Sequence, residues 1–196
     1  MAERGAIVLA GGKSERMGQD KALLSFRGHT LLEGVLLTLR PLVGEIVVVT
    51  ASPNRYELHE VREVTDLFPD CGPVGGIITG LRELGEGQHL VVACDMPLLQ
   101  TPVLRVLLDA ASAEWDAVIP EIGGRLEPLC AVYSASALSP LKNFFTSGQR
   151  AAHKALQTLR VRKLEEEVLR RLDPQLITFT NINTPQDLAA LESRMI

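Results

Sequence analysis

Residues 6–10 form an uninterrupted apolar run, Ala-Ile-Val-Leu-Ala, that passes directly into two glycines. A run without polar positions is typical of a strand in a parallel sheet, because helices cover both faces of such a sheet. The next comparable run, residues 45–50, follows a segment of helical periodicity at residues 31–39 that Thr30 is suited to cap. The order strand, helix, strand predicts two parallel strands joined by a right-handed crossover.

The same alternation continues along the chain and predicts an α/β fold. Further strands are predicted at residues 61–66, 89–94, 117–120, 128–133 and 177–180, with the first of these toward an edge of the sheet. Further helices are predicted near residues 55–59, 77–84, 102–108, 138–145, 151–159 and 185–194. Thr101 and Thr184, each followed by proline, are the expected caps of two of them. Residues 161–171 are charged and are interpreted as a solvated face without a defined element.

Length, charge and cysteine content narrow the class of protein. A chain of 196 residues fits one domain with one core. The formal net charge of −4 argues against a nucleic-acid binder, which would carry a basic excess. The three cysteines form no C-x-x-C pair, so we expect neither a zinc site nor a disulfide framework. We see no signal-type segment and no apolar run long enough to span a bilayer, and we therefore expect a cytoplasmic protein without a membrane partner.

The segment after the first strand has the composition of a phosphate-binding loop. Gly11 and Gly12 lack a Cβ atom, so backbone N–H groups beside them can approach an anion closely. Lys13, Arg16 and Lys21 add three cations suited to a triphosphate. The spacing fits neither the P-loop nor the dinucleotide G-x-G-x-x-G motif, and a plain surface loop remains an alternative. Its place after the first strand favours a site, because α/β sheets bind ligands at the carboxyl ends of their strands.

Three later features also follow predicted strands. Asp66 ends the edge strand, and Asp95 comes directly after the buried run 89–94. Residues 72–76 hold three glycines ahead of a predicted helix, which makes them either an anion-binding helix start or a plain tight turn. A carboxylate at the position of Asp95 is suited to hold Mg²⁺ beside a phosphate, although it could also cap a turn or pair with a cation. If one sheet edge gathers these groups, a nucleotide with Mg²⁺ is the simplest ligand.

Taken in order, the motifs resemble the signature of the molybdenum cofactor guanylyltransferases. They are Leu9-Ala10-Gly11-Gly12-x-Ser14-x-Arg16-Met17-Gly18-x-Asp20-Lys21-Ala22-Leu23-Leu24, Gly72-Pro73-x-Gly75-Gly76, Cys94-Asp95-x-Pro97 and Asn181-Ile182-Asn183-Thr184-Pro185. They span the chain in the family's order, whereas the glycine and D-x-P motifs alone would fit several sister families. The resemblance implies a Rossmann-like three-layer α/β fold with a mostly parallel central sheet. Residues 1–196 would then form a single nucleotidyltransferase domain.

The resemblance implies transfer of GMP from GTP to the terminal phosphate of molybdopterin, with release of pyrophosphate. Lys21, Asp95 and Arg16 would carry catalysis, with Mg²⁺ as the cofactor and Asp95 as its ligand. GTP and molybdopterin are then the partners, and transient contact with other molybdenum-cofactor proteins is compatible with this role. The residues that would bind the nucleotide or lie toward the acceptor are Leu9, Ala10, Gly11, Gly12, Lys21, Thr50, Asp66, Asp95, Asn181 and Asn183.

Three positions within this set differ from the others in what the resemblance implies for them. The family commonly has asparagine where this chain has Thr50, and a hydroxyl lacks the paired donor and acceptor of an amide. The sequence alone therefore does not decide whether Thr50 contacts the nucleotide. Asn181 and Asn183 would lie toward the acceptor. The pattern contains no obvious general base, and none is needed if the attacking group is an ionised phosphate.

Two other functions remain open on the sequence. The first is a sister transferase, such as a molybdopterin cytidylyltransferase or a sugar-phosphate enzyme. Cytidylyltransferases usually carry Leu-Ala-Ala-Gly where residues 9–12 read Leu-Ala-Gly-Gly, and they lack the Asp-Lys pair of residues 20–21. The second is a non-catalytic nucleotide-binding module. The presence of both Lys21 and Asp95 weighs against it, since a binding module could dispense with the metal carboxylate.

Overall fold

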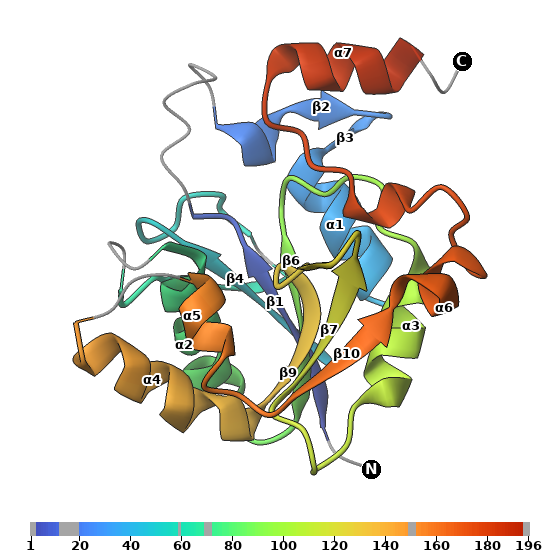
Figure 1. Ribbon diagram of the computed structural model, residues 1–196. Coiled ribbons are helices and arrows are strands. Elements are labelled where there is room, and N and C mark those ends of the chain that lie inside the picture. The colour runs from blue at the N-terminus through green and yellow to red at the C-terminus, as the bar shows by residue number, and fades with distance from the viewer. Residues whose placement is uncertain (1–2, 12–19, 59, 69–71, 149–151, 194–196) are drawn as a thin grey trace.

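The computed structural model describes residues 3–11, 20–58, 60–68, 72–148 and 152–193. These residues build a central eight-stranded sheet in the order β10-β7-β9-β6-β1-β4-β5, with β8 paired to β7. The strands are β1 (Arg4–Leu9), β4 (Glu45–Thr50), β5 (Arg62–Thr65), β6 (Gln88–Ala93), β7 (Ala117–Ile122), β8 (Arg125–Leu126), β9 (Cys130–Ser134) and β10 (Val161–Glu165). Helices cover both faces of the sheet (Figure 1), so the predicted three-layer α/β fold is confirmed.

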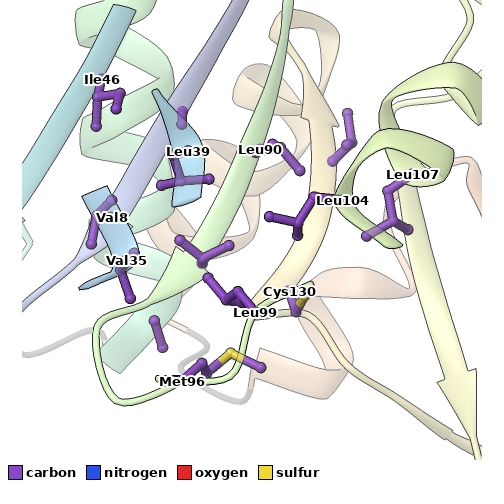
Figure 2. Close-up of a cluster of buried hydrophobic side chains, with 14 of the residues drawn as sticks. Val8, Val35, Leu39, Ile46, Leu90, Met96, Leu99, Leu104, Leu107 and Cys130 are labelled. Carbon is purple, nitrogen blue, oxygen red and sulfur yellow. The ribbon is translucent and has the colours of Figure 1, made fainter. Parts of the chain in front are cut away.

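The two faces of the sheet bury two separate cores. One core packs against α1 (Leu31–Leu39), α3 (Thr101–Ala110) and α6 (Glu166–Arg170), and Figure 2 shows part of it. The other packs against α2 (Gly72–Leu84), α4 (Leu138–Thr146) and α5 (Ala152–Leu156). Successive residues of β1 alternate between the two cores. The apolar run at residues 6–10 is therefore buried on both sides, as its sequence predicts.

A third, smaller cluster packs residues of the hairpin and the start of α1 against the C-terminal segment. The C-terminal helix α7 (Pro185–Ser193) lies beside the short hairpin of β2 (Ser25–Phe26) and β3 (His29–Thr30), away from the two main layers (Figure 1). Phe26, Leu31, Leu98, Ile182 and Leu191 form its buried centre. Nowhere in the part of the chain that the structure describes is a helix both long and apolar enough to traverse a bilayer.

The predicted strand pairing is confirmed around β1. This strand pairs in parallel with β4 and with β6, and β4 pairs in parallel with the edge strand β5. β9 runs antiparallel to both of its neighbours, which makes the sheet mostly rather than wholly parallel. Helix α1 has the predicted bounds, and Thr30 caps it in a reciprocal capping box with Glu33.

Two predicted elements are wrong. Residues 177–180 are not a strand but include a 3₁₀ turn, Ile177–Phe179, because Leu176 adopts a left-handed conformation and Asp173 accepts a hydrogen bond from the Thr178 amide. The helix expected near 55–59 is replaced over its described residues by a bend at 55–56 and irregular backbone at 57–58. The amides of Arg55 and Tyr56 donate to the side chain of Glu63 instead of to backbone carbonyls.

The structure differs from the prediction in one further segment and at the starts of two helices. The charged segment 161–171 contains β10 and α6, and the exposed residues along β10 reflect its place at a sheet edge. Helix α3 starts at Thr101 itself, so Gln100 and not Thr101 occupies the cap position. Helix α2 starts at Gly72 rather than at residue 77, so the glycine-rich turn is the first part of the helix.

Two glycines of α2 are explained by close packing on β1. An ideal Cβ atom on Gly80 would lie 2.7 Å from Cγ1 and 2.8 Å from Cδ1 of the fully buried Ile7. A Cβ atom on Gly76 would lie 2.8 Å from Cδ2 of Leu9. Helix α2 can therefore approach β1 this closely only because positions 76 and 80 carry no Cβ atom. This packing holds the end of β1 against the first turns of α2.

Replacing Gly80 by alanine is expected to destabilise the fold by about 1–3 kcal/mol, because the added methyl group overpacks against Ile7. Gly34→Ala in α1 is the matched control, since no atom lies within 4 Å of its Cβ position. That change should instead stabilise the protein by about 0.5–1 kcal/mol through helix propensity. Urea unfolding measures both free energies. Equal effects at the two positions would contradict the packing argument.

Asp116 ties the beginnings of β7 and β10 together. Its buried carboxylate accepts hydrogen bonds from the Arg160 guanidinium at 2.7 and 3.1 Å and from the Arg160 amide at 2.9 Å. The Ser136 hydroxyl donates at 2.7 Å. These hydrogen bonds, that of the Arg160 side chain above all, hold the pKa of Asp116 well below its usual range, although burial opposes them.

Asp116→Asn is expected to lower the melting temperature by roughly 5 °C at pH 7, because the charged hydrogen bonds are lost. A depressed folded-state pKa means that this stabilisation is present above the unfolded value of about 3.9 and is lost as the pH falls below it. The gap between wild type and variant should therefore narrow below about pH 4. Thermal melts from pH 7 to pH 3 test this. A gap that stays constant with pH would exclude the charged form of Asp116 as its cause.

Candidate functional site

The carboxyl ends of β1, β4 and β6 meet at one edge of the sheet. Leu9 lies in register with Val49 on one side and with Ala93 on the other. Beyond the strands, the Ala10 amide donates to the Val49 carbonyl at 2.9 Å, and the Cys94 amide donates to the Leu9 carbonyl at 3.1 Å. The backbone that leads into Gly11 and the backbone that leads into Asp95 are therefore fixed side by side, at the edge where α/β sheets bind ligands.

Lys21, Asp95 and Asn183 converge at this edge. The Lys21 ammonium lies 3.5 Å from Oδ2 of Asp95 and 3.0 Å from Oδ1 of Asn183. The side chains of Lys21 and Asp95 are 21% and 23% exposed, and Asn183 is exposed. A cation, a carboxylate and an amide from distant parts of the sequence thus share a site that a ligand can reach.

The C-terminal segment is docked onto this site through its backbone. The amide of Ile182 donates to the Asp95 carbonyl at 2.9 Å, and the Ile182 side chain is fully buried. Asp187 accepts from the amides of Asn183 and Thr184 at 2.9 and 2.8 Å. The first of these hydrogen bonds is the main reason that the pKa of Asp187 is lowered. The Thr184 hydroxyl in turn accepts from the Asp187 amide, which confirms Thr184 as the predicted cap of the last helix.

Asp66 and Thr50 have mainly local partners. Oδ1 of Asp66 accepts from the Thr79 hydroxyl and from the Phe68 amide, both at 2.9 Å, and so joins the end of β5 to α2. The Thr50 side chain is buried, and its hydroxyl donates to the carbonyls of Ser52 and Val64 at 2.8 and 3.3 Å. Among the described residues, no hydrogen bond or ion pair links either side chain to Lys21 or Asp95. Thr50 therefore supports the loop after β4.

The remaining predicted residues are placed only in part. Gly11 is exposed, and a Cβ atom there would make ordinary contacts at 3.5 Å and beyond with the backbone at Ala51. Leu9 and Ala10 are buried, so only their backbone groups could serve a ligand. Asn181 is exposed, two residues before Asn183. Gly12 and Arg16, both predicted site residues, lie outside the described residues.

The site includes three residues that sequence reasoning did not connect. The Asp20 carboxylate accepts from Nε of Arg55 at 2.7 Å and lies 3.0 Å from the hydroxyl of Tyr56. The same hydroxyl lies 2.9 Å from the Ala10 carbonyl. Asp20 belongs to the opening motif, but nothing in the sequence around Arg55 and Tyr56 indicates this contact. It depends on the turn after β4, where the sequence predicts a helix.

The donor groups fit one kind of metal site. Among the described residues, no group of three or more His, Cys, Asp or Glu side chains could enclose a metal ion. Mg²⁺ is often held by one or two carboxylates together with substrate phosphates, and Asp95 beside Lys21 fits that mode. The neighbouring Cys94 offers no alternative chemistry, because burial above all raises the pKa of its thiol to about 12. A thiol with that pKa is protonated near neutral pH and is a poor nucleophile.

A hollow on the described residues lies elsewhere. It measures about 370 Å³ and includes residues at the amino ends of β4 and β5, opposite the carboxyl-end site. Its charged groups are engaged with each other, as Arg40 pairs with Glu60 at 2.7 Å and Arg62 with Glu45 at 3.3 Å. The grouping of Lys21, Asp95 and Asn183 is the better candidate, since it combines unlike polar groups at the ligand-binding edge of an α/β sheet.

Known proteins resemble this chain over most of its length. Residues 6–164 match the model of the MobA-like NTP transferase domain. A molybdenum cofactor guanylyltransferase of Desulfosudis oleivorans is 35% identical over 95% of this chain and 93% of its own, and a probable one of Chloroflexus aggregans is 36% identical over 95% and 92%. The crystal structure of molybdopterin-guanine dinucleotide biosynthesis protein A from Archaeoglobus fulgidus superposes with a TM-score of 0.85, at 34% identity over 97% of this chain and 98% of that one.

Proposed function

The chain belongs to the family of MobA-like NTP transferase domains, and on that premise we propose that it transfers GMP from GTP to the terminal phosphate of molybdopterin, releasing pyrophosphate. The relatives that carry the name molybdenum cofactor guanylyltransferase match nearly the whole chain. The observation that supports the proposal most directly is the meeting of Lys21, Asp95 and Asn183 at the carboxyl end of the sheet. The charges present there suit a metal-bound polyphosphate.

Lys21 and Asp95 divide the electrostatic work of the proposed reaction. Bound Mg²⁺ would neutralise phosphate charge and align the reacting groups, with Asp95 as its protein ligand. The Lys21 ammonium would hold phosphate oxygens and offset the negative charge that develops on them. The acceptor is already an ionised phosphate, so no described residue needs to remove its proton.

The observed contact between Lys21 and Asp95 is suited to exchange on binding. At 3.5 Å it is a long ion pair between partly exposed groups, and such pairs contribute little free energy. Lys21 can therefore turn to a phosphate, and Asp95 to a metal ion, at small cost. Until a ligand binds, the 3.0 Å hydrogen bond to Asn183 holds the Lys21 ammonium in the site.

The decisive experiment offers GTP, CTP, ATP and UTP separately, each with Mg²⁺ and molybdopterin, and follows pyrophosphate release. Omitting molybdopterin controls for simple hydrolysis. We expect release with GTP well above that with the other three nucleotides. Preference for CTP would favour a cytidylyltransferase, and absence of release with every nucleotide would favour a binding module. The cytoplasmic location and contact with other molybdenum-cofactor proteins stay predictions.

A further inference from the structure

One hydroxyl group joins the two ends of the segment that the sequence identifies as the phosphate loop. The Tyr56 hydroxyl lies 2.9 Å from the carbonyl of Ala10, which precedes this segment. It also lies 3.0 and 3.2 Å from the two carboxylate oxygens of Asp20, which follows it. The Tyr56 side chain, which comes from another loop, therefore holds Ala10 and Asp20 close together.

Asp20 passes this restraint on to Lys21. Its carboxylate caps the short 3₁₀ helix η1 (Lys21–Leu23) by accepting from the Ala22 amide at 3.1 Å. It also accepts from Nε of Arg55 at 2.7 Å. The Asp20 side chain is only 18% exposed, so loss of one of these donors would leave part of its charge poorly solvated. The position of Asp20 consequently fixes the position of the Lys21 backbone at the start of η1.

Arg55 and Tyr56 are themselves held firmly. Their backbone amides both donate to the carboxylate of Glu63 on β5. Asn54 and Glu57, the residues on either side, have φ angles of 50° and 49°, so the chain bends sharply before and after the pair. The Arg55 guanidinium also lies 5.8 Å from the centre of the Tyr56 ring. The pair thus forms a support anchored to the edge of the sheet.

The protonation state of Tyr56 suits this contact. Burial first, and the neighbouring Asp20 carboxylate next, raise the pKa of the Tyr56 phenol. The Tyr56 hydroxyl therefore keeps its proton at pH values near neutral. Its two neighbours, the Ala10 carbonyl and the Asp20 carboxylate, are both acceptors, so the single hydrogen is shared between them.

We propose that Arg55 and Tyr56 are positioning residues for nucleotidyl transfer, which hold Ala10 and Asp20 together and so direct Lys21 toward Asp95. This inference rests on the proposed function. Neither residue has to touch the nucleotide, because both act through Asp20 and the backbone on either side of residues 11–19. Their contribution is to keep the phosphate-binding groups in a prearranged geometry, which reduces what must be ordered when GTP binds.

Tyr56→Phe tests the proposal, because it removes the hydroxyl and keeps the ring. We expect kcat/KM for GTP to fall about tenfold, with a higher KM for GTP and an unchanged KM for molybdopterin. Partial unfolding would lower the apparent kcat and leave both KM values as they are, so the KM for GTP separates positioning from mere stability. Calorimetry should show a matching loss of GTP affinity.

Tyr133→Phe is the matched control, since the Tyr133 hydroxyl also donates to a backbone carbonyl, that of Pro128 at 3.1 Å. It should leave the KM for GTP unchanged even where the melting temperature falls. The double variant Arg55→Gln/Tyr56→Phe should lose less GTP-binding free energy than the sum of the losses in the two single variants, because both residues act on Asp20.

The proposal is overturned if Tyr56→Phe matches an active wild type in its KM for GTP, or if Tyr133→Phe raises that KM equally. A wild type that releases no pyrophosphate overturns the proposed function itself, and the inference with it. The activity of the wild type thus distinguishes the two failures.

Discussion

Asp95→Asn is expected to lower Mg²⁺-dependent kcat by about 1,000-fold while the protein stays folded. The substitution keeps the shape of the side chain but removes the charge that would bind the metal ion. Loss of one preorganised electrostatic contact at a reacting centre commonly costs two to three orders of magnitude in rate. Pyrophosphate release at saturating GTP, measured across a range of Mg²⁺ concentrations, gives the effect.

The fold should tolerate this change because the structural contact of Asp95 is made by its backbone. Its carbonyl accepts from the Ile182 amide, and the substitution does not alter that bond. Asp109→Asn is the control, because this exposed carboxylate pairs with Arg4 at 3.2 Å, far from the site. It should retain full turnover. Wild-type turnover in Asp95→Asn would remove Asp95 from the proposed metal site.

Lys21→Ala is expected to weaken GTP binding about 10- to 100-fold. A hydrogen bond to a charged group contributes roughly 1.5–3 kcal/mol, and each 1.4 kcal/mol corresponds to a factor of ten in affinity. The folding cost should be small, because the Lys21 contacts with Asp95 and Asn183 are partly exposed. Isothermal calorimetry with GTP and Mg²⁺ measures the affinity directly.

Lys163→Ala provides the comparison for Lys21. This exposed lysine on β10 pairs with Glu121 at 2.6 Å and has no predicted role in binding. Its loss removes the same charge from the protein, so it controls for any general electrostatic attraction of GTP. Equal affinities of Lys21→Ala and wild type would exclude Lys21 from the nucleotide site. Equal losses in the two variants would point to net charge instead of a specific contact.

The sequence predicted the centre of the sheet well because those strands are buried on both faces. Residues 6–10, 45–50 and 89–94 are apolar runs whose burial leaves little choice of structure, and they correspond to β1, β4 and β6. Helix α1 was equally clear, since its apolar periodicity and its Thr30 cap agree. Parallel pairing of β1 with β6 then placed Asp95 beside the end of β1.

The wrong predictions concern segments whose structure depends on residues outside the segment itself. Residues 177–180 are rich in β-forming side chains, but Asp173 and the left-handed Leu176 direct them into a 3₁₀ turn. β10 was missed because, within the described sheet, it pairs with β7 alone and its charged residues remain in solvent at the sheet edge. In both places the pattern within the segment was too weak to decide its structure.

The amino-acid sequence by itself determined the α/β class, the central strands and the chemistry available at their ends, because burial periodicity and charged motifs are local properties. Only the tertiary structure decided which groups meet. Lys21 and Asn183 are 162 positions apart, and Tyr56 lies 46 positions from Ala10 and 36 from Asp20. Such contacts depend on the register of a whole sheet and on turns that other side chains hold in place. No local pattern encodes them.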